Sequence, residues 1–205
     1  MTSPAATLRY VALGDSYTVG TSVPSAESWP SQLVAQAPQI ELVANLGVNG
    51  YSTDDLIRFE LPALDALRPG FGTLQIGVND VVRGVSEADY TSNVDRIFGD
   101  LLARLPPGRI VAIATPDFTV TATGTWFGDP SRQSAAIGRV NEIMSATAAA
   151  WGIAYVSDIF AISQAAGDDR SLLAEDGLHP SGAQYARWVE VILPVVERLL
   201  LPSGG

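Results

Sequence analysis

The sequence contains no cysteine, no lysine and only one histidine. Without cysteine it can form no disulfide, no thiolate nucleophile and no cysteine zinc site. Without lysine it can carry out no Schiff-base chemistry, and it lacks a P-loop lysine and a Ser–Lys dyad. A single histidine also excludes a multi-histidine metal site within one chain. The nucleophilic mechanism that fits these absences best uses a serine activated by the histidine, and it requires no cofactor or metal.

Long apolar runs and basic residues are also scarce. No apolar run approaches the roughly 18 residues that a membrane-spanning helix needs, so we expect no stable membrane insertion. The formal net charge of −10 at pH 7 would repel nucleic acid and anionic membrane surfaces. A neutral or cationic small molecule fits better as a substrate, although an acidic surface also serves simply to keep a protein soluble. The oligomeric state is left open.

Residues 1–7 lack the basic and apolar regions of a secretory signal peptide. Together with the absence of cysteine, this predicts a cytoplasmic protein, with secretion left open if a leader has been removed. The chain of 205 residues is long enough for one sizeable core and short for two. We therefore expect one domain that spans residues 1–205.

Short apolar segments alternate with amphipathic segments along the whole chain. Runs rich in Val, Ile, Leu and Ala predict buried strands, at Leu8–Leu13, Ile40–Asn45, Thr73–Ile76, Ile110–Ala114 and Ile153–Val156. Apolar residues recur at helical spacing after Ser86 and after Asp129-Pro130, and Ser181 with Gln184 has the pattern of a capping box. This alternation predicts a parallel sheet with helices on both faces.

Parallel sheets of this kind bind their ligands beyond the carboxyl ends of the strands. Residues suited to catalysis follow four of the predicted strands, at Ser16, Gly50, Asn79 and the segment Asp176–His179. Because these strand ends meet at one edge of the sheet, four segments that are distant in sequence are expected to converge there. This convergence carries more information than any of the motifs alone.

The segment Asp176-Gly177-Leu178-His179 gives the strongest single signal. An acid three residues before the only histidine can accept a hydrogen bond from the imidazole Nδ1–H, which fixes the tautomer and leaves Nε2 facing outward. A lone histidine is more often a structural group. Here Pro180 and Ser181 end the loop and start a helix, which predicts a rigid loop around His179.

The other motifs are weak in isolation. Gly14-Asp15-Ser16 is typical of an ordinary strand-to-helix turn, although a helix N-terminus at Ser16 would also favour an oxyanion. The residues after Ser16 do not complete the G-x-S-x-G elbow of the α/β-hydrolases. Gly50 could bring its backbone N–H close to a substrate oxygen, and Asn79 offers an uncharged amide donor to developing negative charge.

Taken together, Gly14-Asp15-Ser16, Gly50, Gly77-Val78-Asn79-Asp80 and Asp176–His179 resemble the motifs of the SGNH (GDSL-type) hydrolase family, in the family's order. The resemblance implies a flavodoxin-like three-layer α/β/α fold, with a five-stranded parallel sheet in the order 2-1-3-4-5. It also implies hydrolysis of carboxylic esters. By motif, Ser16 would be the nucleophile, His179 the base and Asp176 its orienting acid. The backbone N–H groups of Ser16 and Gly50 and the Asn79 amide would form the oxyanion hole.

The substrate is less well specified by the sequence. Apolar residues that flank the proposed catalytic groups are candidates for an acyl pocket, namely Tyr17, Val19, Val78, Val81, Val82 and Leu178. The segment Thr115–Asp129, which contains Phe118, Trp126 and Phe127, could overhang the same edge or simply pack on the domain. We expect a small-molecule ester with a short acyl chain or an aryl group.

Two alternative functions remain open at this point. An acyltransferase or a carbohydrate deacetylase would use the same chemical groups as an esterase. A non-catalytic doubly wound module could instead bind a phosphate or flavin through hydroxyl groups of the first loop, at Ser16, Thr18, Thr21 and Ser22. The absence of basic residues between Gly14 and Ser28 argues against this binding module, which also leaves the Asp176–His179 pair without a role.

Overall fold

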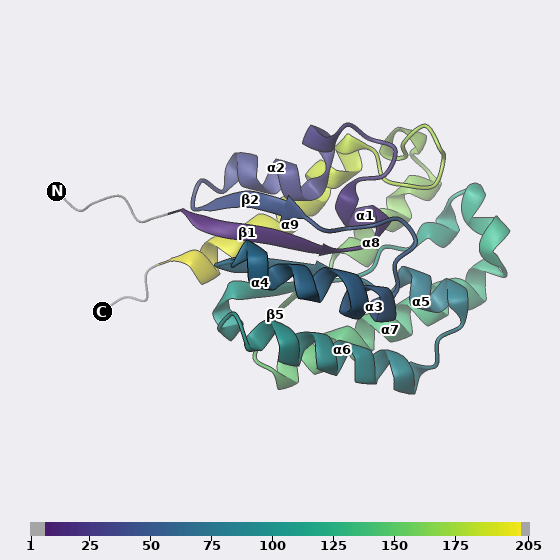
Figure 1. Ribbon diagram of the computed structural model, residues 1–205. Coiled ribbons are helices and arrows are strands. Elements are labelled where there is room, and N and C mark those ends of the chain that lie inside the picture. Colours follow the sequence, from purple (N-terminus) through teal and green to yellow (C-terminus); the bar gives the residue numbers. More distant parts are fainter. Residues whose placement is uncertain (1–6, 202–205) are drawn as a thin grey trace.

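Five parallel strands form the centre of the protein (Figure 1). The computed structural model describes residues 7–201, so residues 1–6, on which the expectation about a leader rests, and residues 202–205 lie outside the described part. The strands are β1 Leu8–Gly14, β2 Ile40–Asn45, β3 Phe71–Gln75, β4 Ile110–Ile113 and β5 Ala154–Val156. Their order in the sheet is β2-β1-β3-β4-β5, and every neighbouring pair is parallel. The predicted parallel sheet and its strand order are therefore confirmed.

All five strands lie where the sequence pattern predicts them, but some of them begin or end one or two residues away from the predicted positions. The third strand begins at Phe71 rather than Thr73, because Phe71 and Gly72 already pair with Tyr10 and Val11 of β1. Strands β3 and β4 are fully buried, as expected for a sheet that is covered on both sides. β4 is apolar on both faces, whereas β3 carries Thr73 and Gln75, whose buried side chains form hydrogen bonds with Tyr10 and Trp29.

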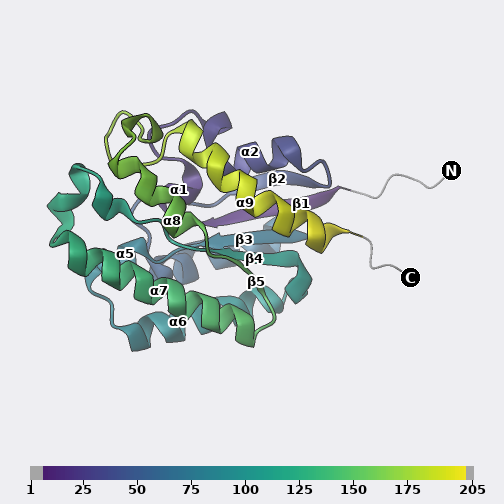
Figure 2. The same ribbon diagram turned by 180° about the vertical axis from the view of Figure 1, so that it is seen from behind.

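Nine α-helices of the described chain surround the sheet, and Figures 1 and 2 show the sheet between two helical layers from opposite sides of the molecule. The helices are α1 Ser16–Val19, α2 Trp29–Gln36, α3 Thr53–Asp55, α4 Leu64–Leu67, α5 Val78–Arg83, α6 Glu87–Leu102, α7 Pro130–Ala150, α8 Ile159–Gln164 and α9 Gly182–Leu200. Helices α2, α8 and α9 lie on one face, and α6 and α7 lie on the other (Figure 2). Each face buries its own hydrophobic cluster, so the expected three-layer arrangement is confirmed.

Two of the predicted helix starts have the expected caps. The Ser86 hydroxyl accepts a hydrogen bond from the backbone N–H of Asp89 at 3.1 Å, and Asp129 caps α7 by accepting from Arg132 N. The capping box predicted for α9 is only half formed. Ser181 accepts from the backbone N–H of Gln184, but the Gln184 side chain donates to the Leu172 carbonyl instead of returning to Ser181. That carbonyl already accepts from Ser181 N, so it ties the start of α9 to the preceding loop.

Within residues 7–201, no helix has the length and apolar character needed to cross a membrane.

We predict that the Ser86→Ala variant has a free energy of unfolding lower by about 1 kcal/mol, because α6 then loses a side-chain cap. Urea unfolding followed by far-UV circular dichroism measures this change. Ser92→Ala is the matched control, since Ser92 is an exposed serine inside the same helix that caps nothing. Equal stabilities of the two variants would contradict the capping role of Ser86.

Candidate active site

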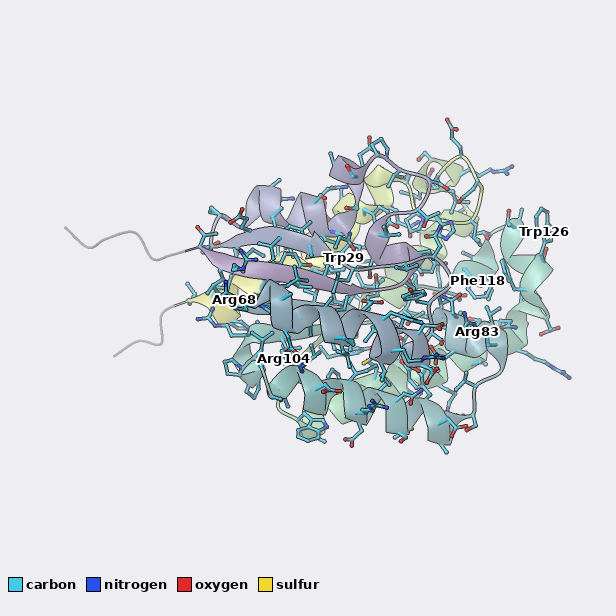
Figure 3. The ribbon with its side chains drawn as sticks, in the orientation of Figure 1. Trp29, Arg68, Arg83, Arg104, Phe118 and Trp126 are labelled. Atoms are coloured by element: carbon cyan, nitrogen blue, oxygen red, sulfur yellow. The ribbon has the colours of Figure 1, made fainter. Side chains whose placement is uncertain are left out.

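A cavity of about 190 Å³ lies at the carboxyl ends of the strands. One part of its wall is polar and consists of Ser16, Asn49, Gly50, Asn79 and His179. The other part is apolar and consists of Tyr17, Val78, Val82, Phe118, Phe127 and Leu178. Figure 3 shows Phe118 and Arg83 at this end of the molecule, with Trp126 farther out. The structure thus brings the predicted residues Ser16, Gly50, Asn79 and His179 to one cavity, and Asp176 lies directly behind His179.

Ser16 is held at the start of α1 by the residue before it. The Asp15 side chain caps this short helix by accepting a hydrogen bond from Tyr17 N at 3.0 Å. As the first residue of α1, Ser16 has a backbone N–H that no carbonyl of the preceding turn accepts, and among residues 7–201 this N–H makes no hydrogen bond. The side chain therefore lies beside a free donor at the positive end of a helical turn.

Asp176 and His179 make the contact that their spacing predicts. The imidazole Nδ1 lies 2.6 Å from Asp176 Oδ2, and Asp176 Oδ1 accepts from the backbone N–H groups of Leu178 and His179, each at 2.9 Å. A carboxylate can only accept, so Nδ1 carries the proton and Nε2 keeps a free lone pair. Burial raises the pKa of Asp176, but hydrogen bonds from Ser22 and His179 outweigh this effect and lower it to about 2. Asp176 is therefore ionised at neutral pH.

The imidazole of His179 is positioned from two sides. Asp176 holds its Nδ1 edge, and the ring of Tyr17 packs at 5.4 Å from the imidazole centroid and at 6.2 Å from Trp188 of α9. No hydrogen bond joins Ser16 Oγ to His179 within the described chain. Such bonds are often long in the absence of substrate and shorten when it binds, so the shared cavity is the relevant observation.

Asn79 and Gly50 present two further donors. The Asn79 amide Nδ2 donates one hydrogen to the Tyr51 carbonyl at 2.9 Å, which identifies the nitrogen and leaves its second hydrogen free. Gly50 has φ +81°, and its backbone N–H makes no hydrogen bond among residues 7–201. Its carbonyl accepts from the Arg83 guanidinium at 2.6 Å. With the Ser16 N–H, the polar wall therefore carries three unpaired donors.

The backbone conformation explains the glycine at position 50. Gly50 has φ +81°, a left-handed conformation that glycine adopts at little steric cost. A Cβ atom there would meet no protein atom within 4 Å, so packing against the rest of the protein does not require glycine, and the close approach of a substrate oxygen to its N–H stays a prediction.

The apolar wall agrees in part with the expected acyl pocket. Val78 and Val82 lie one helical turn apart on α5 and both line the cavity, whereas Val81 lies on another face and packs against the core. Val19 does not line the cavity either. The predictions for Val19 and Val81 were therefore wrong, because flanking a motif in sequence does not determine which face a side chain occupies.

The segment Thr115–Asp129 both packs on the protein and contributes to the cavity. Its short helices η5 Phe118–Val120 and η6 Thr123–Phe127 bring Phe118 and Phe127 edge to face, with ring centroids 5.5 Å apart. Phe118 is buried and Phe127 half-exposed, and both line the cavity. Trp126 is 82% exposed and lies outside the lining. The buried Asp117 anchors this segment to α7 and α8 by accepting hydrogen bonds from the side chains of Ser134 and Gln164.

Several residues of the site were not found by sequence reasoning. Ser22 Oγ donates to Asp176 Oδ2 at 2.6 Å, and Thr21 Oγ1 donates to Asn49 Oδ1. The sequence suggests Ser22 and Thr21 only as hydroxyl groups that could bind a phosphate or a flavin. Both hydroxyls donate to side chains of the protein, so neither is a free donor for a phosphate.

Three buried carboxyl groups, those of Asp15, Glu60 and Asp80, belong to the segments around the site. Glu60 ends the π-helical segment Leu56–Glu60, and its Oε2 accepts from Gly14 N at 2.9 Å, while Oε1 has no partner in the described chain. Burial raises the pKa of Glu60 to about 9 and that of Asp15 to about 7. Burial also raises the pKa of Asp80, although the backbone N–H and the hydroxyl of Thr53 both donate hydrogen bonds to its carboxyl group. Glu60 is therefore neutral at pH 7, which limits negative charge in the segments around the site.

No group of three or more Asp, Glu or His side chains suited to a metal ion is found among residues 7–201.

Comparisons with known proteins identify the family and the fold. The model of the GDSL-like lipase/acylhydrolase family matches residues 12–187, whereas curated protein sequences give no match. Among solved structures, TesA is similar with 20% identity and a TM-score of 0.75, over 94% of this chain and 99% of that one. A lipase/acylhydrolase from Enterococcus faecalis has 20% identity and a TM-score of 0.74, over 96% and 99%. The acetylxylan esterase Axe2 from Geobacillus stearothermophilus has 18% identity and a TM-score of 0.72, over 93% and 94%.

We predict that Glu60→Gln flattens the pH dependence of stability. In the folded protein Glu60 keeps its proton up to about pH 9, whereas an unfolded chain loses it near the ordinary value of 4.5. The folded state binds the extra proton in this window, so the free energy of unfolding falls as pH rises. Between pH 5 and 7 the wild type should lose about 2–3 kcal/mol relative to the variant, at 1.36 kcal/mol for each unit.

Urea unfolding at several pH values between 5 and 9 measures this difference. Glu41→Gln is the control, because Glu41 is exposed on β2. If Glu60→Gln and the wild type show parallel pH profiles, Glu60 is ionised in the folded protein and the assignment is wrong.

Proposed function

Because the chain belongs to the GDSL-like lipase/acylhydrolase family, we propose that it is a serine esterase that hydrolyses carboxylic esters of short acyl chains or aryl groups. One observation carries this proposal. Ser16, an imidazole with a free Nε2 and three unpaired N–H donors surround a single cavity. A nucleophile, a base held by an acid and a set of oxyanion donors are the groups that acyl transfer to water requires.

In the first half of the proposed reaction, Ser16 Oγ attacks the ester carbonyl carbon. His179 Nε2 accepts the hydroxyl proton as the bond forms, and the imidazole becomes cationic. Asp176 stabilises this cation through the 2.6 Å hydrogen bond to Nδ1 and keeps the ring from rotating. The ionised state of Asp176 at neutral pH supports this role.

The carbonyl oxygen becomes an oxyanion in the tetrahedral intermediate. The three free donors, Ser16 N–H, Gly50 N–H and the second Asn79 amide hydrogen, are suited to bind it. Asn79 is prepared for this task before substrate arrives, because the Tyr51 carbonyl fixes its amide plane. Arg83 stabilises the Gly50 peptide from the opposite side by binding its carbonyl oxygen.

Collapse of the intermediate releases the alcohol and leaves the acyl group on Ser16. His179 returns its proton to the leaving alkoxide, so the alcohol departs neutral. A water molecule then attacks the acyl-enzyme, His179 takes its proton, and the same imidazole protonates Ser16 Oγ as the carboxylic acid leaves. Every proton in this cycle moves through the one histidine of the chain.

The size of the cavity supports a small acyl or aryl group. Its volume of about 190 Å³ is below the roughly 300–1,000 Å³ of pockets that enclose a drug-sized ligand. The apolar wall of Phe118, Phe127, Leu178, Val78 and Val82 suits a short hydrocarbon or a phenyl ring. A long acyl chain would extend out of the cavity into water.

Acetylated carbohydrate is a second candidate substrate. Trp126, next to the wall residue Phe127, is 82% exposed and presents a flat apolar indole near the cavity. A sugar ring could lie against this indole while its acetyl group enters the cavity. The acetylxylan esterase Axe2, named for its action on an acetylated polysaccharide, has the same fold.

We predict that the wild type hydrolyses p-nitrophenyl acetate and butyrate faster than the longer-chain esters, and that a fluorophosphonate probe labels it once. Ser16→Ala should do neither, because the nucleophile is gone. Ser25→Ala, an exposed serine outside the cavity, should keep both properties. A folded wild type that is inert to all esters and to the probe would refute the esterase proposal.

We predict that Asn79→Ala lowers kcat by ~10²–10³-fold with a smaller change in KM, as expected when one oxyanion donor is removed. Steady-state kinetics on the preferred p-nitrophenyl ester measures both constants. A urea titration of the same variant shows whether loss of the Tyr51 contact has disturbed the fold. Turnover within a few-fold of the wild type would remove Asn79 from the mechanism.

A further inference from the structure

The short turn after α1 is tied directly to the Ser16 peptide. Gly20 N and Thr21 N both donate to the Ser16 carbonyl oxygen, at 3.1 and 3.0 Å. We call residues 20–22 the nucleophile turn. Because it shares the Ser16 carbonyl, a displacement of this turn moves the proposed nucleophile as well.

Ser22, the last residue of the nucleophile turn, binds the acid that orients His179. Its Oγ donates to Asp176 Oδ2 at 2.6 Å, and the same oxygen lies 2.6 Å from His179 Nδ1. The remaining hydrogen bonds to this carboxylate come from the backbone of Leu178 and His179, within its own loop. In the described chain, Ser22 is therefore the donor that connects the carboxylate to a segment 154 residues away in sequence.

The backbone of Ser22 makes this contact notable. Ser22 has φ +67°, a left-handed conformation that glycine adopts easily and L residues rarely do. Arg68 is the other non-glycine residue with positive φ between residues 7 and 201. Such a conformation persists where surrounding interactions hold it in place. At Ser22, the hydroxyl supplies what a glycine could not, which is the hydrogen bond to Asp176.

The neighbouring hydroxyl of the nucleophile turn binds a different part of the site. Thr21 Oγ1 donates to Asn49 Oδ1, and Asn49 lines the cavity immediately before Gly50. Two adjacent side chains thus connect Ser16 to the Gly50 loop and to the acid–histidine loop.

We propose that the nucleophile turn holds the three parts of the site in register, with Ser22 as a positioning residue that acts on His179 through Asp176. This inference rests on the proposed function, because it assigns a role in that reaction. Ser22 would orient the carboxylate and share its negative charge. Thr21 would position Asn49 and the Gly50 peptide.

Two features of the site determine how strongly the loss of the Ser22 hydroxyl affects His179. Ser22 is exposed, so water can replace its hydrogen bond in part but cannot tether one loop to another. Among residues 7–201, the titratable side chains with a recorded contact to the imidazole are Asp176 and Tyr17. Loss of the Ser22 hydroxyl leaves more charge on Asp176 Oδ2, which favours the cationic imidazole.

The test compares Ser22→Ala and Ser22→Gly with the wild type, with Ser25→Ala as the control. Both Ser22 variants should lose roughly tenfold in kcat with little change in KM, as for one hydrogen bond to a charged group. Their stabilities should differ, because glycine relieves the left-handed strain and alanine does not. A loss of kcat that is common to both variants is therefore not a consequence of altered folding.

Nuclear magnetic resonance supplies a readout that does not depend on activity. The only imidazole in the chain is that of His179, so its carbon-bound protons titrate without overlap from another histidine. In both Ser22 variants the midpoint of this titration should lie above that of the wild type, because the carboxylate loses a donor that shares its charge. An unchanged midpoint together with an unchanged kcat would overturn the proposal.

Thr21→Val distinguishes the two side-chain contacts of the nucleophile turn, the one from Thr21 to Asn49 and the one from Ser22 to Asp176. It removes the hydroxyl that binds Asn49 at nearly constant volume, so kcat should fall several-fold while the imidazole titration stays at its wild-type midpoint. A shift of that midpoint in Thr21→Val equal to the shift in Ser22→Ala would mean that the turn merely supports the fold, and would reject the separate role of Ser22.

The outcomes also distinguish this inference from the proposed function. If the wild type hydrolyses no ester but the Ser22 variants shift the imidazole titration, the tether exists and the esterase proposal fails. If the wild type is an active esterase and the Ser22 variants match it in kcat and titration, the esterase proposal stands and the role of Ser22 is wrong.

Discussion

The close approach of β1 to β3 at Gly14 is the constraint on which the site depends. A Cβ atom at this position would lie 2.2 Å from the Gln75 carbonyl oxygen and 2.3 Å from Thr18 Oγ1, so only glycine fits. This contact lets the end of the central strand turn at once into α1, with Ser16 two residues later. The Gly14 N–H donates a hydrogen bond to the buried carboxyl group of Glu60, which would otherwise lack a hydrogen-bond donor. The position of the proposed nucleophile thus follows from the packing of two strand ends.

A second level of organisation comes from side chains that bind across loops. The Asp176 carboxylate alone accepts four hydrogen bonds, from Ser22, Leu178 N, His179 N and His179 Nδ1. Arg83 similarly joins the Gly50 carbonyl to Asp55 on the helix that follows it. These contacts convert four separate strand-end loops into one rigid polar wall. Rigidity matters for the proposed reaction, because donors that are already oriented cost nothing to reorganise when charge develops.

Local patterns in the sequence predicted the features that local physics determines. Buried strands appear as short apolar runs, and Ser86 and Asp129 cap helices because their hydroxyl and carboxylate reach a backbone N–H three residues later. The Asp176–His179 contact is equally local. The Ser22–Asp176 and Thr21–Asn49 contacts could not be predicted, since they depend on how loops far apart in sequence meet. Glu60 was overlooked for a related reason, because nothing in the residues around it indicates burial beneath Gly14.

The anchoring of the aromatic segment at Asp117 has a consequence for how such an enzyme can diversify. Phe118 and Phe127 belong to a segment that Asp117 fastens to Ser134 and Gln164. None of these residues bonds to Ser16, Gly50, Asn79 or His179. The apolar part of the wall is therefore fastened mainly through Asp117, with one contact to the acid–histidine loop, the 3.4 Å hydrogen bond from Thr123 Oγ1 to the Asp176 carbonyl. For the proposed esterase, substitutions at Phe118 and Phe127 would change the shape of the apolar wall while Asp117 still holds the segment in place.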